Sequence, residues 1–248
     1  MQNNLQDNEK SMWFDNFYAV PTIGIQYESN RSDIFTIQKT AFSYDETYKV
    51  ECSTFRQCRV SKEGLEIVLE PGNIIASHKT HIEIKPDVYG RPVVKESESK
   101  TYLSTLKYLI STLYDLITRL CEIDSKNRHR EITQIGIVLS TRMQIADVPP
   151  GISSLLEAQT RIWQQKLLSY DFRLLTEISK ENGISTRCHH MAKKTPEPDE
   201  DLDFALDYQR IYRSSNNPNL GSFNKICEAF YPEAVLYFES FGKKGIQK

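Results

Sequence analysis

A change of hydrophobic period near residue 101 constrains the fold of this chain more than any other feature. Residues 101–121, TYLSTLKYLISTLYDLITRLC, carry apolar side chains at three- and four-residue spacing. The stripe consists of Leu103, Leu106, Ile110, Leu113, Ile117 and Leu120, and is widened by Leu109 and Leu116. A stripe of this width predicts a helix that packs on a sheet. A dimeric coiled coil is the alternative, but the pattern lasts only about three heptads.

The sequence before this helix has the pattern of strands. Between residues 13 and 87, runs rich in β-branched and aromatic residues are separated by turn signals such as Pro71-Gly72-Asn73. The runs are YAVPTIGIQYE, DIFTIQKTAF, YKVECSTFRQCRV, LEIVLE and NIIASHKTHIEIK. They predict a meander of four or five antiparallel strands.

The sequence after the helix alternates strands and helices. A buried strand is expected over 132–145, a helix over about 152–168, and a further strand over 202–215. Asn182-Gly183, between DFRLLTEIS and ISTRCHHMAK, is a strong hairpin signal. A final helix is expected over 222–241, kinked or split by Pro232.

Taken together, these segments predict an α+β fold in which a largely antiparallel sheet packs against about three helices. We expect a disordered tail over 1–11, one domain over 12–241 with its best sub-boundary at 124–131, and a basic tail over 242–248.

Composition narrows the functional classes. The formal net charge of −2 argues against a surface built as a whole to hold nucleic acid, although a local patch remains open. No apolar run approaches the roughly 20 residues that span a bilayer, and the polar N-terminus lacks the apolar stretch of a signal peptide. The odd number of cysteines, five without a C-x-x-C spacing, favours free thiols. These observations predict a cytoplasmic protein without a membrane segment.

Glu83 and Lys85 form an E-x-K step in HIEIKPD, the step with which one class of nucleases holds Mg²⁺ and a water. A hairpin centred on Pro71-Gly72 places Leu69 opposite Ile74 and Leu65 opposite His78. Extended further, this register sets Lys79, His81, Glu83 and Lys85 opposite Gly64, Lys62, Val60 and Cys58.

In this register no second carboxylate lies beside Glu83, and one carboxylate cannot hold the metal and position a water. The residues therefore read as the solvated face of a strand. The nuclease stays as the alternative, with Glu83 and Lys85 assisted by Glu70, Asp87 or His81, and Mg²⁺ is predicted only under that alternative.

Other catalytic and cofactor motifs are absent. Neither G-x-S-x-G, nor G-x-G-x-x-G, nor a Walker loop occurs. His78 and His81 point to opposite faces of a strand, while Cys188 and His190 share one. Because a zinc site would require scattered groups to converge, we predict no metal and no cofactor.

Small basic clusters mark the best contact surface. They consist of Lys126, Arg128 and Arg130 in the segment after the long helix, and Lys193 and Lys194 before an acidic loop. Each has acidic neighbours, so solvated loops are the plainer interpretation. The functional interpretation is contact with phosphate or with an acidic partner.

A resemblance covers about half of the chain. ITQIGIVLSTRMQIADVPPG, the following helix and hairpin, LDFALDY and the closing LYFESF look like the C-terminal half of a sporadically distributed family of uncharacterised bacterial proteins. Gly136 and Pro149 match that pattern, whereas Val138-Leu139-Ser140 replaces its Arg-Tyr-Ile-Asn continuation. The resemblance implies no activity and no catalytic residues. It implies a bacterial accessory protein from mobile or defence-related loci.

The leading hypothesis is a non-enzymatic binding protein that acts through a protein partner or by self-association. The metal-dependent nuclease or phosphodiesterase is the first alternative. A small-ligand binder with a cavity between sheet and helices is the second.

Overall fold

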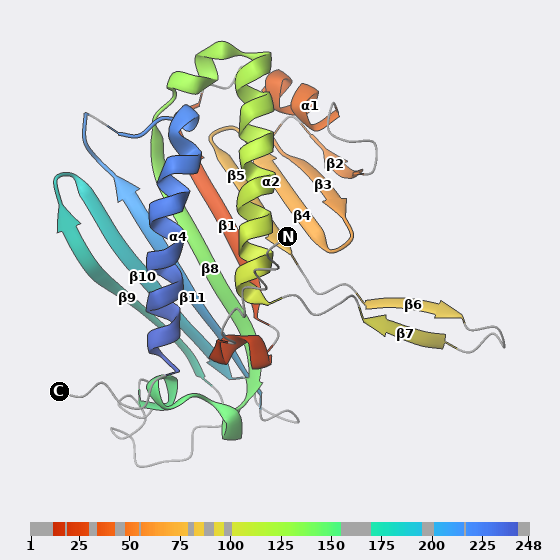
Figure 1. The fold of residues 1–248 in the computed structure, drawn as a ribbon, viewed down its shortest axis with the longest axis vertical. Helices are drawn as coiled ribbons and strands as arrows, with labels where there is room; N and C mark the ends of the chain where they lie inside the picture. The colour runs from red at the N-terminus through yellow and green to blue at the C-terminus, as the bar shows by residue number, and fades with distance from the viewer. Residues whose placement is uncertain are drawn as a thin grey trace, which may run out of the picture.

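The protein is described by a computed structural model in which residues 12–17, 19–29, 34–42, 48–54, 56–78, 82–86, 92–96, 101–154, 170–194, 201–215 and 217–242 are described. It has an α+β fold in which helices pack on a nine-stranded antiparallel sheet, as the sequence predicts (Figure 1). The strands of the sheet are β1 (Val20–Tyr27), β2 (Lys49–Ser53), β3 (Cys58–Lys62), β4 (Leu65–Glu70), β5 (Asn73–His78), β8 (Ile132–Gln144), β9 (Tyr170–Glu181), β10 (Ile184–Lys194) and β11 (Asp201–Tyr212). The remaining elements are α1 (Ile34–Phe42), α2 (Tyr102–Ile123), α4 (Phe223–Ser240), a two-stranded sheet of β6 (Ile82–Pro86) and β7 (Pro92–Glu96), and short 3₁₀ turns that include η1 (Trp13–Phe17) and η3 (Ser125–His129).

The centre of the sheet is the antiparallel pair of β1 and β8. The strand order is β2-β3-β4-β5-β1-β8-β11-β10-β9, so β1 joins the N-terminal strands to the C-terminal ones. In this pair Gly24 lies opposite Gly136, with Ile23 opposite Ile137 and Ile25 opposite Ile135. The sheet is therefore continuous across the two halves of the sequence.

The two halves repeat the same order of elements. In the first half, β1 is followed by α1, by the meander β3-β4-β5 and by α2, and β5 returns beside β1. In the second, β8 is followed by helical residues 150–154, by the meander β9-β10-β11 and by α4, and β11 returns beside β8. The helices α2 and α4 run in opposite directions across the same side of the sheet (Figure 1). Among the described residues, the first half has further strands outside its meander, namely β2 at the edge of the main sheet and the separate pair β6 and β7.

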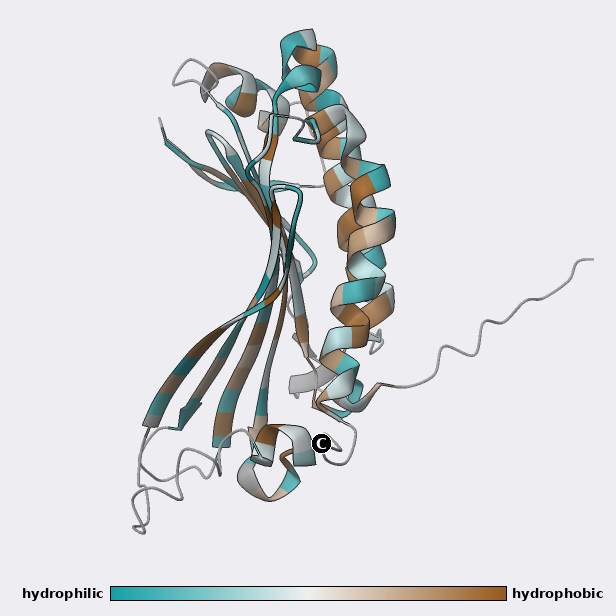
Figure 2. Ribbon diagram, turned by 90° about the vertical axis from the view of Figure 1, so that its left-hand side faces the viewer, coloured by the Kyte–Doolittle hydropathy of each residue, from teal (hydrophilic) through white to brown (hydrophobic). Residues whose placement is uncertain are grey.

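One face of the sheet carries the hydrophobic core. Along β8 the buried side chains include those of Ile135, Ile137, Leu139 and Met143, which alternate with less buried neighbours. Figure 2 shows the helices on this side. From α2 the core receives Leu106, Leu109, Leu113, Leu116 and Leu120, and from α4 it receives Phe223, Phe230, Val235 and Phe238. The predicted leucine stripe thus packs on the sheet.

The start of α2 is fixed by the segment before β1. Thr101 caps the helix, because its hydroxyl accepts a hydrogen bond from the backbone N–H of Ser104 at 3.2 Å. The backbone N–H of Tyr102 donates to the Asp15 carboxylate at 2.8 Å, which places a negative charge at the helix N-terminus. The buried Tyr102 hydroxyl donates to the Val138 carbonyl of β8 at 3.0 Å, so the helix is also tied to the sheet.

The predicted Asn-Gly hairpin is confirmed. Asn182 and Gly183 both have positive φ values, 49° and 78°, and they connect β9 to β10. Two consecutive residues of positive φ match the right-handed twist of a hairpin, and Asn-Gly adopts them at low cost.

Three predictions in the N-terminal meander were wrong. The run predicted as a strand over 33–42 instead contains the helix α1 from Ile34 to Phe42, and its buried residues Ile37 and Ala41 lie four apart, which fits a helix. The run 48–60 is divided into β2 and β3. The Thr54 hydroxyl accepts hydrogen bonds from the N–H groups of Arg56 and Gln57 and closes the turn between them.

The third error concerns the strand that was to hold the E-x-K step. Its first part, β5, has the predicted register with Leu69 opposite Ile74 and Leu65 opposite His78. It ends at His78, and the E-x-K residues belong to β6, which pairs with β7 outside the main sheet.

The last helix was predicted to be kinked or split at Pro232, and it is not split, because α4 continues through Pro232 from Phe223 to Ser240. Buried Phe230 and Ala234 hold both sides of the proline against the core. The predicted tail over 1–11, the helix beyond 154, the loop 195–200 and residues 243–248 lie outside the described residues.

Replacement of Phe238 tests the core under α4. Its ring is fully buried and meets Tyr102 and Tyr208 edge to face. We expect Phe238→Ala to lower the free energy of unfolding in urea by about 3–5 kcal/mol, because it removes buried area and leaves a cavity. Leu236→Ala on the same helix is the control, since Leu236 is 64% exposed. A similar loss in both variants would contradict the assignment of the buried side.

Candidate functional site on the uncovered sheet face

The second face of the nine-stranded sheet is the candidate site, and we call it the uncovered face. Within the part of the chain that the structure describes, α2 and α4 lie on the opposite side (Figure 2). Strand pairing arranges the side chains of the uncovered face in rows that run across β1, β8, β11, β10 and β9. From one end of the sheet to its centre these rows are Arg142-Asp203-Lys193-Asp171, then Val20-Ser140-Ala205-Met191-Arg173, then Thr22-Val138-Asp207-His189-Leu175, then Gly24-Gly136-Gln209-Arg187-Glu177.

The first row lies in a hollow of the uncovered face. The hollow has a volume of about 690 Å³, and Val20, Ala205 and Met191 are among the side chains of its lining. Basic and acidic groups alternate along the row. Arg142 contacts Asp201 at 2.9 Å and Asp203 at 4.0 Å, and Arg173 contacts Asp171 at 3.2 Å. This end therefore offers charges of both signs around an apolar patch.

The third row sets an acid and an imidazole side by side at the middle of the sheet. Asp207 of β11 lies directly opposite His189 of β10. The Gln209 side-chain amide donates to the Asp207 carboxylate at 2.6 Å. Burial raises the pKa of Asp207, although Gln209 and the nearby His189 act in the opposite direction. Its carboxylate is thus partly withdrawn from water on a face that no described helix covers.

The fourth row contains two glycines at the centre of the sheet, Gly24 of β1 and Gly136 of β8. A Cβ atom on Gly24 would meet Ile75 Cγ1 at 3.4 Å, and one on Gly136 would meet Asp207 Oδ1 at 3.5 Å. Both are ordinary van der Waals distances, so packing within the chain does not require glycine. Glycine inside a strand lowers stability and often marks a close approach of a ligand or another backbone.

Polar networks stiffen the uncovered face near both edges of the sheet. On the β9 side, Glu177 accepts a hydrogen bond from the Ser185 hydroxyl at 2.8 Å and lies 3.5 Å from the Arg187 guanidinium. On the β3 side, Arg59 pairs with Glu66 at 3.1 Å. Opposite charges across neighbouring strands stabilise the sheet modestly and fix the positions of their side chains.

The E-x-K residues are not part of this face. Glu83 lies opposite Lys95 and Lys85 opposite Val93, so neither has an acid as its cross-strand partner. The predicted neighbours Val60 and Cys58 belong to β3, which pairs with β2 and β4. Glu70 ends β4 and accepts hydrogen bonds from Gln57 and Asn73, both at 3.1 Å. His81 and Asp87 lie outside the described residues.

Cys188 and His190 point together into the core rather than to the uncovered face. The Nε2 atom of His190 lies 3.0 Å from the Tyr237 hydroxyl, and its Nδ1 atom lies 3.4 Å from the Leu174 carbonyl oxygen. Burial lowers the pKa of His190 and raises the pKa of Cys188 to about 12, so the thiol stays protonated. Among the described residues no group of three His, Cys, Asp or Glu could hold a metal ion.

The predicted basic contact residues lie at two ends of the sheet. Lys126 and Arg128 belong to η3, and Arg130 follows it just before β8. Lys193 and Lys194 end β10, where Lys194 lies opposite Leu202 and thus one strand from Met143. From Ile132 to Met143 the strand extends about 36 Å at 3.3 Å per residue. Lys193 lines the hollow of the uncovered face, and the three residues near η3 do not.

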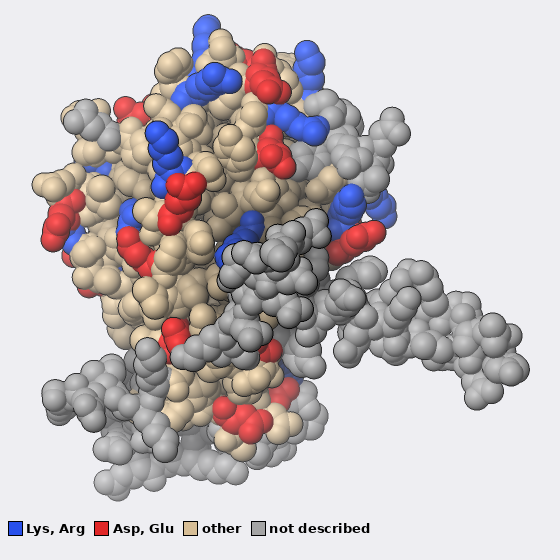
Figure 3. All heavy atoms as spheres, viewed as in Figure 1, with Lys and Arg blue, Asp and Glu red and all other residues tan. Residues whose placement is uncertain are grey.

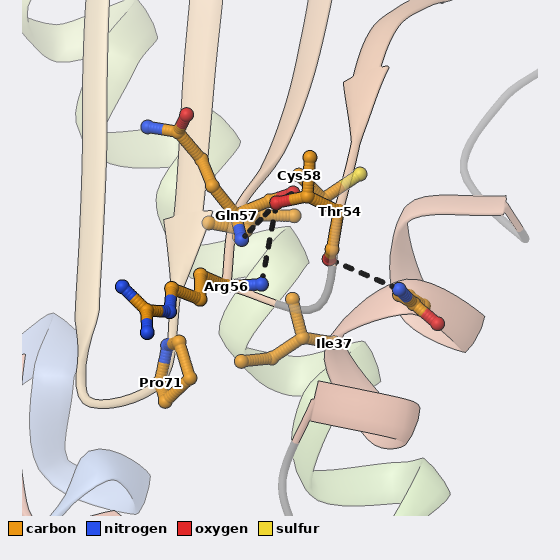
Figure 4. A pocket seen from close by; sticks show the side chains of 8 residues that line it. Ile37, Thr54, Arg56, Gln57, Cys58 and Pro71 are labelled. Atoms are coloured by element: carbon orange, nitrogen blue, oxygen red, sulfur yellow. Dashed lines mark hydrogen bonds between the residues drawn. The ribbon is translucent and has the colours of Figure 1, made fainter. Parts of the chain in front are cut away.

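A narrow cleft lies between α1 and the β3–β4 end of the sheet, lined by Ile37, Gln57, Cys58 and Pro71 among others (Figure 4). Its volume is about 10 Å³, which is enough for about one water. The helix-covered side shows Lys and Arg interspersed with Asp and Glu (Figure 3). Neither feature forms a site for an organic ligand or a polyanion.

Comparisons with known proteins do not indicate a function for this chain. The chain matches no protein-family model, and no curated protein matches it. The resemblance to a bacterial family therefore remains a prediction. No helix among the described residues is long and apolar enough to cross a membrane.

The residues of the central rows were not identified from the sequence. The alternation in LDFALDYQR does put Asp207 on the polar side of its strand, opposite to Phe204 and Leu206. What the sequence lacked was the cross-strand pairing that brings Asp207 to His189 and Gly24 to Gly136. The glycine pair joins two segments that lie more than a hundred residues apart in the sequence.

The pH dependence of unfolding tests the withdrawn carboxylate. Because the folded protein raises the pKa of Asp207, it binds a proton more readily than the unfolded chain, and the stability from this group falls as pH rises through the raised pKa. We expect Asp207→Asn to raise the urea midpoint at pH 7 and to lose this advantage near pH 4. Asp203→Asn, an exposed position on the same strand face, is the control and should change little. A lower midpoint for Asp207→Asn at pH 7 would contradict the assignment.

Proposed function

We propose that this protein is a non-enzymatic binding protein that engages a folded protein partner through the uncovered face of its sheet. The observation that carries the proposal is the pair of central glycines. A Cβ atom at either glycine would meet its neighbours at ordinary van der Waals distances, so packing within the chain does not require glycine, and we infer that the bare backbone serves the approach of a partner.

The chemistry of the surrounding rows supports a binding surface. Apolar side chains such as Val138, Ala205 and Met191 stand between charged ones. In the first row Arg142 and Asp171 are held by ion pairs. Protein interfaces combine an apolar centre with a polar rim in this manner. Side chains that are already held in position before binding also lose less conformational entropy on association.

A protein partner fits the charges better than a nucleic acid. Arg142, Lys193 and Arg173 each have an acidic neighbour on the same face, namely Asp203 or Asp171. Nucleic-acid binding draws on a surplus of basic groups that neutralise phosphates. We also propose that the protein is an accessory protein from bacterial mobile or defence-related loci. This part of the proposal rests on the family resemblance alone.

Site-specific photocrosslinking in cells of the source organism tests the proposal. A photoreactive amino acid at Val138 or Ala205 should crosslink one and the same protein, because both positions lie on the uncovered face. The same amino acid at Leu236, on the exposed side of α4, is the matched control. Capture of that protein from Leu236 alone, or no protein from Val138 and Ala205, would contradict the proposal.

Substitution of both glycines distinguishes an effect on binding from an effect on folding. Gly24→Ala with Gly136→Ala should leave the free energy of unfolding unchanged or raise it by about 0.4–1 kcal/mol per site, because alanine restricts the unfolded chain and its Cβ fits. The photocrosslink from Val138 should weaken in the same variant, since the two methyl groups stand where the partner approaches. A stable variant with an undiminished crosslink would show that the glycines do not serve binding.

The nuclease alternative has its own test. Incubation with single- and double-stranded DNA and RNA in Mg²⁺ or Mn²⁺ should give no cleavage that depends on the E-x-K step, because Glu83 lies opposite a lysine and not an acid. The wild type is compared with Glu83→Ala and Lys85→Ala. Cleavage by the wild type that both substitutions abolish would establish the nuclease instead.

A further inference from the structure

We propose that two copies of this chain associate edge to edge through β9, which pairs antiparallel with β9 of the second copy about a two-fold axis at Leu175. The proposal stands on the exposure of the strand, on its place at the edge of the described sheet and on the order of charges along β9. It is independent of the partner proposed for the uncovered face.

The edge strand β9 is long and exposed, and it carries apolar side chains between charged ones. It has twelve residues, and in the described part of the chain it pairs only with β10. Leu174, Leu175 and Ile178 are 37%, 48% and 40% exposed, and they are three of the large hydrophobic side chains that the described surface exposes. An edge strand also leaves a row of N–H and C=O groups open to another chain. Together these features are typical of a strand that accepts a neighbour.

The other edge of the sheet shows how such a strand is protected. There β2 has only five residues, with exposed Lys49 and Glu51 and an irregularity of register between Val50 and Cys52. Short length, charge and bulges are common means of blocking edge pairing. The strand β9 shares the charges and an irregularity at Ile178, so it differs from β2 in its length of twelve residues and in its exposed leucines.

The internal repeat shows where the neighbour of β9 would lie. Because β9 holds the place in the second half that β3 holds in the first, the outer side of β9 corresponds to the position of β2. No described strand fills that position. A strand from a second copy would complete the second half as β2 completes the first.

The charges of β9 select one register of self-pairing. With Leu175 on the two-fold axis, Arg173 of each copy lies opposite Glu177 of the other, and Phe172 lies opposite Ile178. The axis is perpendicular to the sheet, so directly opposed residues share a face. Two Arg–Glu pairs then flank the Leu175 contact. In the single chain Arg173 already meets Asp171, and Glu177 meets Arg187, so the new pairs extend existing networks.

Neighbouring registers are unfavourable. A shift by two residues in one direction sets Asp171 opposite Glu177, and a shift in the other direction sets Asp171 opposite Glu181. Like charges directly opposed across strands are destabilising. The register centred on Leu175 is therefore the one that the sequence of β9 favours, and it keeps the helices of both copies on the same side of the joined sheet.

Charge reversal with restoration tests the pairing. Sedimentation velocity over a concentration series should show a monomer–dimer equilibrium for the wild type. Arg173→Glu should shift it to monomer, because the new acid lies opposite Glu177, and Arg173→Glu with Glu177→Lys should restore the dimer. Leu236→Lys on α4 is the matched control and should leave the dimer unchanged. A wild type that stays monomeric, or a dimer that Arg173→Glu does not weaken, would overturn the proposal.

Cysteine crosslinking tests the register without relying on the charge variants. In a Cys52→Ser background, Leu175→Cys should form a disulfide-linked dimer under mild oxidation, because residue 175 meets its own copy. Ile178→Cys should form none, since it meets Phe172. The cysteines at 58, 121, 188 and 227 are buried and give a low background. Equal crosslinking from both positions, or from neither, would overturn the proposed register.

The proposed binding through the uncovered face and the proposed pairing through β9 are tested by different measurements, so either can be refuted without the other. Loss of the Val138 photocrosslink in the glycine variant concerns the uncovered face, whereas the β9 variants are judged by self-association of the purified chain. A monomeric protein that still crosslinks a partner from Val138 would refute edge pairing and leave the proposed function standing.

Discussion

The pairing of β1 with β8 is the interaction on which the rest of the structure depends. These strands are separated by more than a hundred residues, yet they form the centre of the sheet and carry Ile23, Ile25, Ile135 and Ile137 into one core. Because side chains alternate along a strand, this pairing also decides which residues of every other strand face the helices. A slip by one residue would expose the isoleucines and bury the charged rows.

The same constraint produces a molecule with two unlike faces. Burial on the helix side is nearly complete, whereas the other face keeps acidic, basic and apolar side chains in register across five strands. The repeated order of elements explains why the rows are regular, since each half contributes a central strand followed by a returning meander. Among the described residues the halves differ at their outer edges, where the first has the additional strand β2.

Local sequence signals predicted much of this fold. The leucine stripe of α2, the Asn-Gly turn, the long strand β8 and the register of β4 with β5 follow from periodicity and turn chemistry, which act over a few residues. The helix α1 was missed because its β-branched and aromatic residues suit a strand, while the contacts of Ile37 and Ala41 with the core decide the matter.

The candidate site was less accessible to sequence reasoning. The pairs Asp207–His189 and Gly24–Gly136 exist only through strand pairing, and no single segment contains a signal for them. The E-x-K step misled for a related reason. Its apolar alternation appeared to continue β5, whereas pairing moves it to a separate hairpin.

The short turn η1 has a mechanical consequence for the whole molecule. Asp15 binds the first turn of α2, and the Trp13 indole donates to the Phe238 carbonyl near the end of α4 at 2.9 Å. A side chain at Gly242 would overlap the Trp13 ring, so the chain after α4 is shaped to admit it. The turn η1, which ends at Phe17, therefore connects the beginning of α2 to the end of α4. Through these contacts it links the two halves of the fold.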